Sequence, residues 1–542
     1  MHKTQLLSMA QHPSVALTGR IESWLREPEG RLPVSCTVLN VTDVTESWLF
    51  TSKALRYAAG VALYLNDVQY PSHMEINQFT IDWSGNLPTI HEYDYVIEVT
   101  DSMEGDLEKR PWQCRASIEQ SWGWFYQLLR DGMGARIFVD LSALRPAGTA
   151  NERGLVASGP ESFAEIYEAI ADYAAEPGFV TLAAVYSTIN GVLRRGGTFK
   201  NGAITIHLDS DHPEVLPYLE ATPEQLPWAK RCLDVGEDFL ELPYLDLLCK
   251  QISAGQVWLA KKRFDAKGKR LFSNVCLEIA IPSRGTCLLL HHNLGAVENV
   301  ADIPDQMCNI MKLLCAIHPS TGVGDTEIYL HPYEDRQVGL GVIGLGSLLA
   351  LEGITYKELV EAWESLLSRG PLTSDKPTQL AFHLIHGLET AANYARRMGM
   401  ERSLTIAPTA SCAYRYEDRE GYTTTPEISP PIARDVDRYS GTFGIQAYSH
   451  HPRVETAEEV GFDLYFRLAD CWQKTIKATG QAHAISFNIW DTQPVDQEFL
   501  TRWFNSDLWN IYYRLLVQQK DALDKTVIQS CDLSSECSSC AE

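Results

Sequence analysis

The sequence has no apolar run as long as the about 18 residues that a membrane-spanning helix needs, so no membrane span is expected. Basic residues are also scarce, because 46 lysines and arginines stand against 70 aspartates and glutamates, for a net charge of −24. A broad basic surface for nucleic acid is therefore excluded as the main feature, whereas a local basic pocket for a phosphate is not. Residues 1–20 contain no hydrophobic segment followed by a cleavage site, so we expect no signal peptide and a cytoplasmic protein.

Cysteine is too rare for a disulfide-stabilised fold, since there are 13 cysteines in 542 residues and the number is odd. In a reducing compartment most cysteines are buried apolar side chains. We expect this role for six of them: Cys114, Cys232, Cys249, Cys308, Cys315 and Cys471. The cysteines in less ordinary surroundings include Cys36, Cys276, Cys287 and those at the C-terminus.

The chain ends in a Cys-x-x-Cys pair, Cys537 and Cys540, among serine, glutamate and alanine residues that cannot bury it. Two accessible thiols at this spacing can exchange with another disulfide. The alternative is a zinc site with Cys531 as a third ligand, but no convincing fourth ligand is nearby. We therefore interpret the pair as redox-active and expect no metal site.

The composition is that of a globular protein, with 45% hydrophobic and 21% charged residues. No internal repeat or long linker divides the chain, so we expect one large α/β domain over residues 1–518 and a tail over 519–542. The predicted elements are helices over 215–265, 380–400 and 455–480, a strand over 202–209, and a strand with a following turn over 405–412.

Three glycines, Gly339, Gly341 and Gly344, match the G-x-G-x-x-G pattern. A dinucleotide site needs a strand before this pattern and an acidic residue about 20 positions after it. The preceding residues, HPYEDRQVG, look unlike a buried strand, so we interpret the three glycines as close-packing positions.

The segment SNVCLEIAIP places Asn274, Cys276 and Glu278 at alternate positions, and alternate side chains of an extended chain face the same side. A thiol between an amide and a carboxylate is unusual for a core, because a lone buried carboxylate costs several kcal/mol. Cys287 follows closely enough to return on a hairpin. The alternative is an ordinary strand with surface Asn and Glu and one buried cysteine.

Two further segments have the composition of phosphate-binding elements. The first follows the apolar run SLTI, and its small and hydroxyl residues can begin either an ordinary capped helix or one whose free N–H groups bind phosphate. The second is a basic glycine loop, which is either a phosphate contact or a solvated turn. These segments are Ala407-Pro408-Thr409-Ala410-Ser411-Cys412 and Arg194-Arg195-Gly196-Gly197-Thr198-Phe199-Lys200.

These pieces occur in one order, which is Ser35-Cys36, the RRGG loop, N-x-C-x-E with a second cysteine, RQVGLGVIGLGSLLA, APTAS and a terminal cysteine pair. The ordered set resembles the catalytic (large) subunit of ribonucleotide reductases over most of the chain, and least over residues 61–130. The resemblance implies a ten-stranded α/β barrel with a central finger loop, surrounded by helices. It also implies reduction of ribonucleotides, expected to be diphosphates, to 2′-deoxyribonucleotides for DNA synthesis.

The resemblance further implies roles for five residues. Cys276, on the finger loop, would carry the thiyl radical that abstracts the ribose 3′-hydrogen. Glu278 would accept the 3′-hydroxyl proton, and Asn274 would hold the substrate. Cys36 and Cys287 would be the dithiol that becomes a disulfide, since removal of the 2′-hydroxyl is a two-electron reduction.

Other roles also follow from the resemblance alone. Cys537 and Cys540 would re-reduce that disulfide, and thioredoxin or glutaredoxin would recharge them. A dNTP or ATP specificity effector would bind near Asp43 and the loop Arg194–Lys200, at the interface of an effector-induced homodimer. Only 35 residues precede Cys36, so we expect no N-terminal ATP-cone. The substrate-binding residues would be Ser35, Thr409, Ala410, Ser411 and Cys412.

The family divides by its source of the radical. Class I members receive it from a ferritin-like small subunit through two tyrosines near the C-terminus, and Tyr512-Tyr513 resembles that pair. Class II members split adenosylcobalamin, and residues 140–160 resemble a class II segment. We favour class I, with no covalently bound cofactor, and the small size suits a phage or a bacterium.

Two other classes of protein explain less of the sequence. A thiol–disulfide oxidoreductase would account for the C-terminal cysteines but not for APTAS or the RRGG loop. A nucleotide-binding regulatory protein without catalysis would account for the loops, but it would not need Cys276 and Glu278 together with Cys36 and Cys287.

Overall fold

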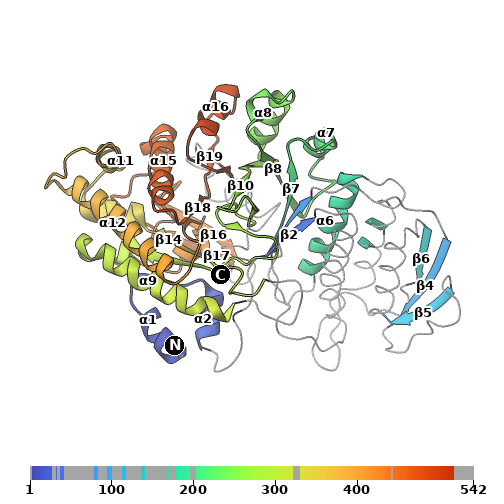
Figure 1. Cartoon of the computed structure of the whole chain (residues 1–542), viewed down its shortest axis with the longest axis horizontal. Coiled ribbons are helices and arrows are strands. Elements are labelled where there is room, and N and C mark those ends of the chain that lie inside the picture. The colour runs from blue at the N-terminus through green and yellow to red at the C-terminus, as the bar shows by residue number, and fades with distance from the viewer. Residues whose placement is uncertain are drawn as a thin grey trace. The chain divides into compact units, whose positions relative to one another are not determined.

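The structure is a computed structural model that describes residues 3–26, 178–195, 203–321, 330–440 and 444–517, and only Leu32, five strands and a few isolated helical residues from 27 to 177. The chain divides into two compact units (Figure 1). Unit 1 comprises residues 1–38 and 235–542, and unit 2 comprises residues 39–234. In the described part, no helix combines the length and the apolar character needed to cross a bilayer.

A five-stranded sheet forms the centre of unit 1, in the order β1-β13-β14-β15-β18. Its last four strands are parallel, and β1 pairs antiparallel with β13. Every residue of β14 is buried, as is typical of a parallel strand covered on both faces. The strands are β1 (Val15–Ala16), β13 (Leu289–Asn293), β14 (Gln337–Ile343), β15 (Arg402–Ile406) and β18 (Ala482–Ile485).

Helices pack on this sheet and form one large apolar core with it. The long helices α9 and α12 lie side by side, which Figure 1 shows. A capping box of Thr355 and Glu358 begins α11, and Asp375 caps α12. The helices around the sheet are α1 (Lys3–Ala10), α2 (Gly19–Arg26), α9 (Ile303–Ile317), α10 (Leu345–Glu352), α11 (Tyr356–Leu367), α12 (Lys376–Arg397), α14 (Ala457–Val460) and α15 (Phe462–Ala478).

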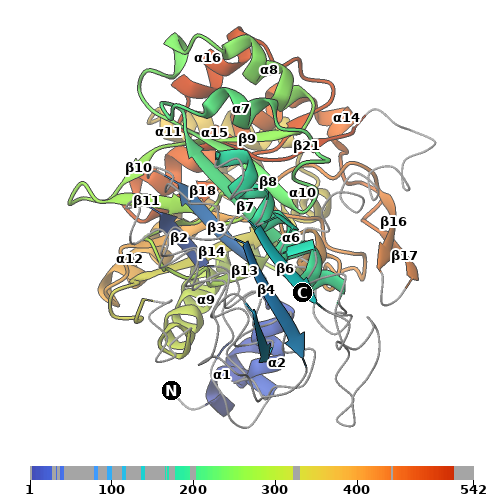
Figure 2. The same cartoon turned by 90° about the vertical axis from the view of Figure 1, so that its right-hand side faces the viewer.

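The rest of unit 1 consists of short strands and helices. An antiparallel hairpin, β11–β12, supports the turn that carries Cys276. Figure 2 shows α8 beside α16, and Gln497 of α16 donates a hydrogen bond to Asp246 of α8. These elements are α8 (Leu245–Ser253), β9 (Val257–Lys261), β10 (Arg263–Phe264), β11 (Arg270–Ser273), β12 (Ala280–Ile281), α13 (Ala410–Ala413), β16 (Asp435–Ser440), β17 (Gly444–Ser449), β19 (Ile489–Trp490), α16 (Gln497–Asn505), β20 (Asn510–Ile511) and β21 (Arg514–Leu515).

Unit 2 contains two sets of parallel strands. The strands β3, β7 and β8 pair in that order, and β4 lies between β5 and β6. The described elements are β3 (Gln78–Trp83), β4 (Asp94–Thr100), β5 (Gln113–Ser117), β6 (Arg136–Asp140), α6 (Phe179–Arg195), β7 (Ala203–Asp209), α7 (Val215–Glu220) and β8 (Ala229–Val235), whose last residue falls in unit 1. The strand β2 (Thr37–Val41) spans the other boundary between the units.

The predicted mixture of α and β structure is confirmed, and so are the helices near 380–400 and 455–480 and the strand near 202–209. The prediction of a largely helical segment over 215–265 is wrong, because β8 and β9 lie within it. Short buried strands and buried helical turns have similar apolar patterns. The described strands form several sheets and no closed barrel, so the ten-stranded barrel stays a prediction.

The glycine pattern begins in β14 and ends at Gly344, the residue between β14 and α10. Gly339 and Gly341 are residues of β14, which shows that the preceding segment does enter a buried strand. A side chain on Gly339 would collide with Leu289 and would lie 2.9 Å from the Cδ1 atom of Ile279. Gly344 has a φ of 80° and precedes α10. Close packing therefore explains these glycines.

The packing around β14 gives a first prediction. Gly339→Ala should lower the free energy of unfolding by about 1–3 kcal/mol, because the added methyl group overpacks the strand. Gly341→Ala is the matched comparison in the same strand with a milder steric conflict, since its methyl group would lie 3.1 Å from its nearest atom, His291 Cδ2. Denaturant unfolding of both variants measures the effect. Equal stability of the Gly339 variant and the wild type would contradict the close-packing interpretation.

Candidate active site

Residues 274–279 form a tight turn between β11 and β12. The amide of Asn274 donates to the carbonyl of Ile279 at 3.1 Å, and the amide of Ile279 donates to Asn274 Oδ1 at 2.9 Å. Leu277 has a φ of 66°, which is uncommon for a residue with a side chain. The expectation of an extended segment with Asn274, Cys276 and Glu278 on one face is therefore wrong, because the chain reverses here.

Side chains from distant parts of unit 1 hold this turn in place. Ser486 Oγ donates to the carbonyl of Cys276 at 2.6 Å. The carbonyl of Leu277 accepts from Arg263 and from Asn510, both at 3.1 Å. Cys276 is only 2% exposed. Because buried carbonyl groups need hydrogen-bond partners, these contacts fix the position of the turn and of the thiol that it carries.

Glu278 is buried and is held through both its backbone and its side chain. Its carbonyl accepts from the amide of Ala484 at 2.7 Å, which joins the turn to β18. Ser486 Oγ lies 3.3 Å from Glu278 Oε2, within donating distance. Glu278 is only 1% exposed, so a negative charge on its carboxyl group costs free energy. The groups around this carboxyl group therefore strongly influence whether it holds a proton.

The structure brings Cys287 to the same place. Asn274 Nδ2 lies 3.7 Å from Cys287 Sγ and donates to it. The Cys287 side chain is half-buried and packs against Phe272, Ile279 and Ile281. Asn274, Cys276, Glu278 and Cys287 thus share one small region of the fold.

The neighbouring β12 strand is fixed by a buried histidine. His483 Nδ1 accepts from the amide of Ala280 at 3.0 Å, and His483 Nε2 lies 2.9 Å from the carbonyl of Val338. Burial, together with nearby arginine charge, lowers the pKa of His483 well below its ordinary value. The ring is therefore neutral and acts as a structural link between β12, β14 and β18.

The APTAS segment begins the short helix α13. Thr409 has a φ of 47°, and its Oγ1 accepts a hydrogen bond from the amide of Glu427 at 2.9 Å. The Cys412 thiol points to the carbonyl of Leu17, at 3.6 Å, and burial raises its pKa to about 12. Only the main chain of Cys412 is therefore suited to the predicted phosphate contact. Ala410 is partly exposed.

Sequence reasoning missed a second buried carboxyl group, Glu427. It is 2% exposed, and burial raises its pKa to about 8, with the nearby Glu278 charge contributing in the same direction. Glu427 Oε1 accepts from Ser429 at 3.1 Å and from Asn488 at 3.3 Å. The PEISPP sequence around it has no catalytic spacing, so a buried acid in a proline-rich segment was the only available indication.

The predicted tyrosine pair is in contact. The ring centroids of Tyr512 and Tyr513 lie 3.9 Å apart, and Trp258 packs against both rings at 4.5 and 5.3 Å. The amide of Tyr513 lies 3.3 Å from Asn488 Oδ1, to which it donates. Asn488 thus connects the tyrosine segment to Glu427. Trp258, like Glu427, was not predicted from the sequence.

Several predicted residues lie outside the described part of the chain: Ser35, Cys36, Asp43, Gly196, Gly197, Thr198, Phe199, Lys200, Cys537 and Cys540. For Ser411 and for Arg194 and Arg195, at the end of α6, only the helical backbone is described. The same holds for Cys114, whose strand alone is described. The other expected core cysteines are buried, except Cys308, which is half-buried.

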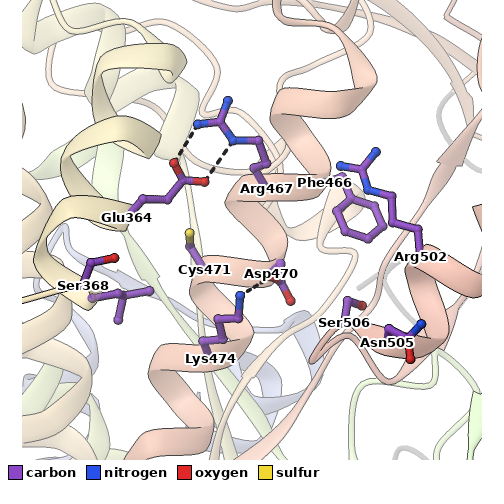
Figure 3. Close-up of a pocket in the computed structure, with 11 residues that line it drawn as sticks. Glu364, Ser368, Phe466, Arg467, Asp470, Cys471, Lys474, Arg502, Asn505 and Ser506 are labelled. Atoms are coloured by element: carbon purple, nitrogen blue, oxygen red, sulfur yellow. Dashed lines mark hydrogen bonds and ion pairs between the residues drawn. The ribbon is translucent and has the colours of Figure 1, made fainter.

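Two other groups of polar side chains lie away from this turn. A pocket of about 610 Å³ lies between α11, α15 and α16, but its charged groups already pair, as Figure 3 shows for Arg467 with Glu364 and Lys474 with Asp470. In unit 2, within the described residues, His207 lies with Cys232 and Asp234 at the spacing of metal ligands. His207 Nδ1 is hydrogen-bonded to Asp234 Oδ1 at 2.9 Å, whereas His207 Nε2 is buried and has no hydrogen-bond partner among the described residues.

The anchoring of the turn gives a second prediction. Asn510→Ala removes donors to the carbonyls of Leu277 and Ile485, and it should lower the free energy of unfolding by about 2–4 kcal/mol. The control is Asn505→Ala, on the exposed face of α16, with an expected change within about 0.5 kcal/mol. Denaturant unfolding compares the two. Equal effects would show that the turn does not depend on Asn510.

No family model matches the chain. Two vitamin B12-dependent ribonucleoside-diphosphate reductases of Mycobacterium tuberculosis, from strains CDC 1551 / Oshkosh and ATCC 25618 / H37Rv, are 25% identical to it over 364 residues, or 58% of this chain. The aligned region spans 45% and 44% of those relatives, which is less than half of their length.

Among solved structures, the class Id ribonucleotide reductase alpha subunit of Actinobacillus ureae matches with a TM-score of 0.50 and 14% identity. That match covers 96% of this chain and 89% of the other. At such low identity it shows a shared fold. The chain therefore has the fold of a ribonucleotide reductase alpha subunit and is similar in sequence to vitamin B12-dependent ribonucleoside-diphosphate reductases.

Proposed function

We propose that the chain is the catalytic subunit of a ribonucleotide reductase, which reduces ribonucleotides, expected to be diphosphates, to 2′-deoxyribonucleotides. The observation that carries this proposal is the buried turn that holds Cys276 beside Glu278, with Asn274 in contact with Cys287. A structural cysteine would need neither the carboxyl group nor the second thiol. The likeness in fold and sequence to ribonucleotide reductases supports the same proposal.

In the proposed reaction, a Cys276 thiyl radical takes the 3′-hydrogen atom of the ribose and becomes a thiol. Glu278 acts as general base and accepts the proton of the 3′-hydroxyl group. Cys36 and Cys287 supply two electrons and the protons needed for the 2′-hydroxyl group to leave as water, and they become a disulfide. Return of the hydrogen atom from Cys276 to the 3′-carbon restores the thiyl radical.

The remaining features of the proposal lie mainly outside the described residues. The main chain at Thr409–Cys412 holds the substrate phosphates, with Ser35 as a further substrate contact. Asp43 and the loop Arg194–Lys200 form the effector site of a homodimer. Cys537 and Cys540 regenerate the dithiol and are reduced in turn by thioredoxin or glutaredoxin in the cytoplasm. A ten-stranded barrel around the turn completes this arrangement.

For the radical source we propose class I, in which a ferritin-like small subunit delivers the radical through Tyr512 and Tyr513. The contact between the two rings supports this, because neighbouring phenols in contact are suited to passing an electron and a proton between them. Trp258 shields the pair, since it packs on both rings.

A second candidate is a class II enzyme that uses adenosylcobalamin. This candidate is supported by the two relatives from Mycobacterium tuberculosis, which are named as vitamin B12-dependent. When bound, that cofactor would generate the radical without a small subunit. The roles of Cys276, Glu278 and Cys287 would be the same in either case.

The proposed radical chemistry predicts that Cys276→Ala abolishes reduction of a ribonucleoside diphosphate, with dithiothreitol as reductant and either radical source. The control is Cys308→Ala, since Cys308 is a half-buried residue of α9 outside the turn. Chromatography of the deoxynucleotide product measures the outcome. Retained reduction by the Cys276 variant would eliminate the thiyl mechanism.

The two radical sources predict opposite results for the tyrosine pair. Under class I, Tyr512→Phe and Tyr513→Phe each abolish activity with a small subunit, because phenylalanine cannot be oxidised at an accessible potential. Tyr333→Phe, at a site that is 83% exposed, should leave activity unchanged. Full activity of both tyrosine variants with adenosylcobalamin alone would establish class II instead.

A further inference from the structure

Glu427 lies in the candidate active site although no motif singled it out. Its carboxyl group is close enough to Glu278 for the two charges to interact, and both side chains are buried. Two buried carboxyl groups that interact in this way do not both ionise readily, because like charges repel and neither is solvated. One of the two carboxyl groups is therefore expected to carry a proton.

The surroundings of Glu427 favour the protonated form there. Glu427 Oε1 accepts two hydrogen bonds, from Ser429 and Asn488, while Oε2 is buried and has no hydrogen-bond partner in the described part of the chain. The principal groups that act on its charge are Ser429, the amide of Ile428, Asn488 and Glu278, and none of these is a cation. Considering the described residues alone, an ionised Glu427 would be a buried charge without a counter-ion.

The neighbouring titratable groups do not supply a positive charge either. Tyr356 of α11 and Tyr465 of α15 both interact with the charge of Glu427. Burial raises the pKa of each phenol well above its ordinary value, and the Glu427 charge adds to that effect. Both phenols are therefore neutral and act only as dipoles.

The backbone holds Glu427 in a costly conformation. Its φ is 27° and that of Thr409 is 47°, both in the left-handed region that residues with side chains rarely adopt. The two residues are joined by the hydrogen bond from the Glu427 amide to Thr409 Oγ1. Backbone strain of this kind persists only where the surrounding structure enforces it. The hydrogen bond between the two strained residues couples Glu427 to the predicted phosphate-binding segment.

We propose that Glu427 is a second carboxyl group of the active site, which stays protonated and thereby leaves Glu278 as the ionised base. This inference rests on the proposed function for the role of Glu278, but the location of the proton can be tested without it. Glu427 is a positioning residue, because it acts through Glu278.

The proton on Glu427 has a defined effect on stability. Its pKa is about 8 in the folded protein and has its ordinary value of 4.5 when unfolded. Between these values the folded chain binds one more proton than the unfolded chain, so stability falls as the pH rises through that window. Above it both states are ionised at this position, and the contribution stops changing.

The experiment compares wild type with Glu427→Gln, which keeps the shape of a protonated carboxyl group. The unfolding free energy of wild type should fall more steeply than that of the variant between about pH 5 and pH 8. Glu361→Gln, an exposed position on α11, is the control and should keep the wild-type slope. In infrared spectra at pH 7, wild type and control should show the carbonyl stretch of a buried protonated carboxyl group, and Glu427→Gln should lack it.

The pH dependence of enzyme activity tests the proposed effect of Glu427 on Glu278. Glu427→Gln should lose any decline in kcat/KM that wild type shows as the pH rises above about 8, because glutamine cannot ionise. Equal pH slopes of stability in Glu427→Gln and wild type, or absence of the infrared band from wild type, would overturn the proposal. So would a decline in kcat/KM above about pH 8 that Glu427→Gln shares with wild type, because glutamine cannot ionise.

Failure of the proposed function and failure of the proposed protonation of Glu427 give different results. If wild type reduces no ribonucleotide with either radical source, the proposed function fails. The stability and infrared measurements still determine whether Glu427 carries a proton, since they require neither substrate nor radical.

Discussion

The arrangement of unit 1 depends on the hydrogen bonds that hold the turn at residues 274–279. Its main-chain carbonyls are buried, so each needs a donor from elsewhere in the fold. Ser486, Asn510 and Arg263 supply those donors from separate segments of the chain. Removing one partner of such a bond leaves a buried polar group unpaired, at a cost of about 1–3 kcal/mol. Ser486 follows β18, whereas Asn510 and Arg263 lie in β20 and β10, so three separate segments contribute donors to the turn.

The same anchoring brings polar groups into a region that excludes water. Glu278 and Glu427 are both buried, so each influences the protonation of the other far more strongly than it would at the surface. Asn488 links this pair to the tyrosine segment, because it contacts the Glu427 carboxyl group, the Tyr465 hydroxyl group and the amide of Tyr513. Asn488 therefore joins Glu427 to the proposed radical route by hydrogen bonds, and Glu427 interacts with the charge of Glu278.

The helices that were predicted correctly from the sequence are long or strongly amphipathic. Asp375 caps α12, a capping box of Thr456 and Glu459 begins α14, and α12 and α15 each have an apolar stripe, so local interactions and burial favour the same structure. The prediction of helix over 215–265 was wrong because β8 and β9 are short buried strands, and their apolar residues follow a pattern similar to that of buried helical turns. The alternation in SNVCLEIAIP was also misread as an extended strand, since nothing local reveals the left-handed Leu277.

By itself, the sequence determined the α/β character and the set of residues with reactive side chains, including Cys276, Glu278, Asn274 and Cys287. These follow from residue type and spacing, which are local properties. Only the tertiary structure decided that 274–279 is a turn, that the Cys412 thiol faces away into the core, and that Glu427 lies near Glu278. The physical reason is that these outcomes depend on donors, charges and packing from segments far apart in the chain, which no local pattern encodes.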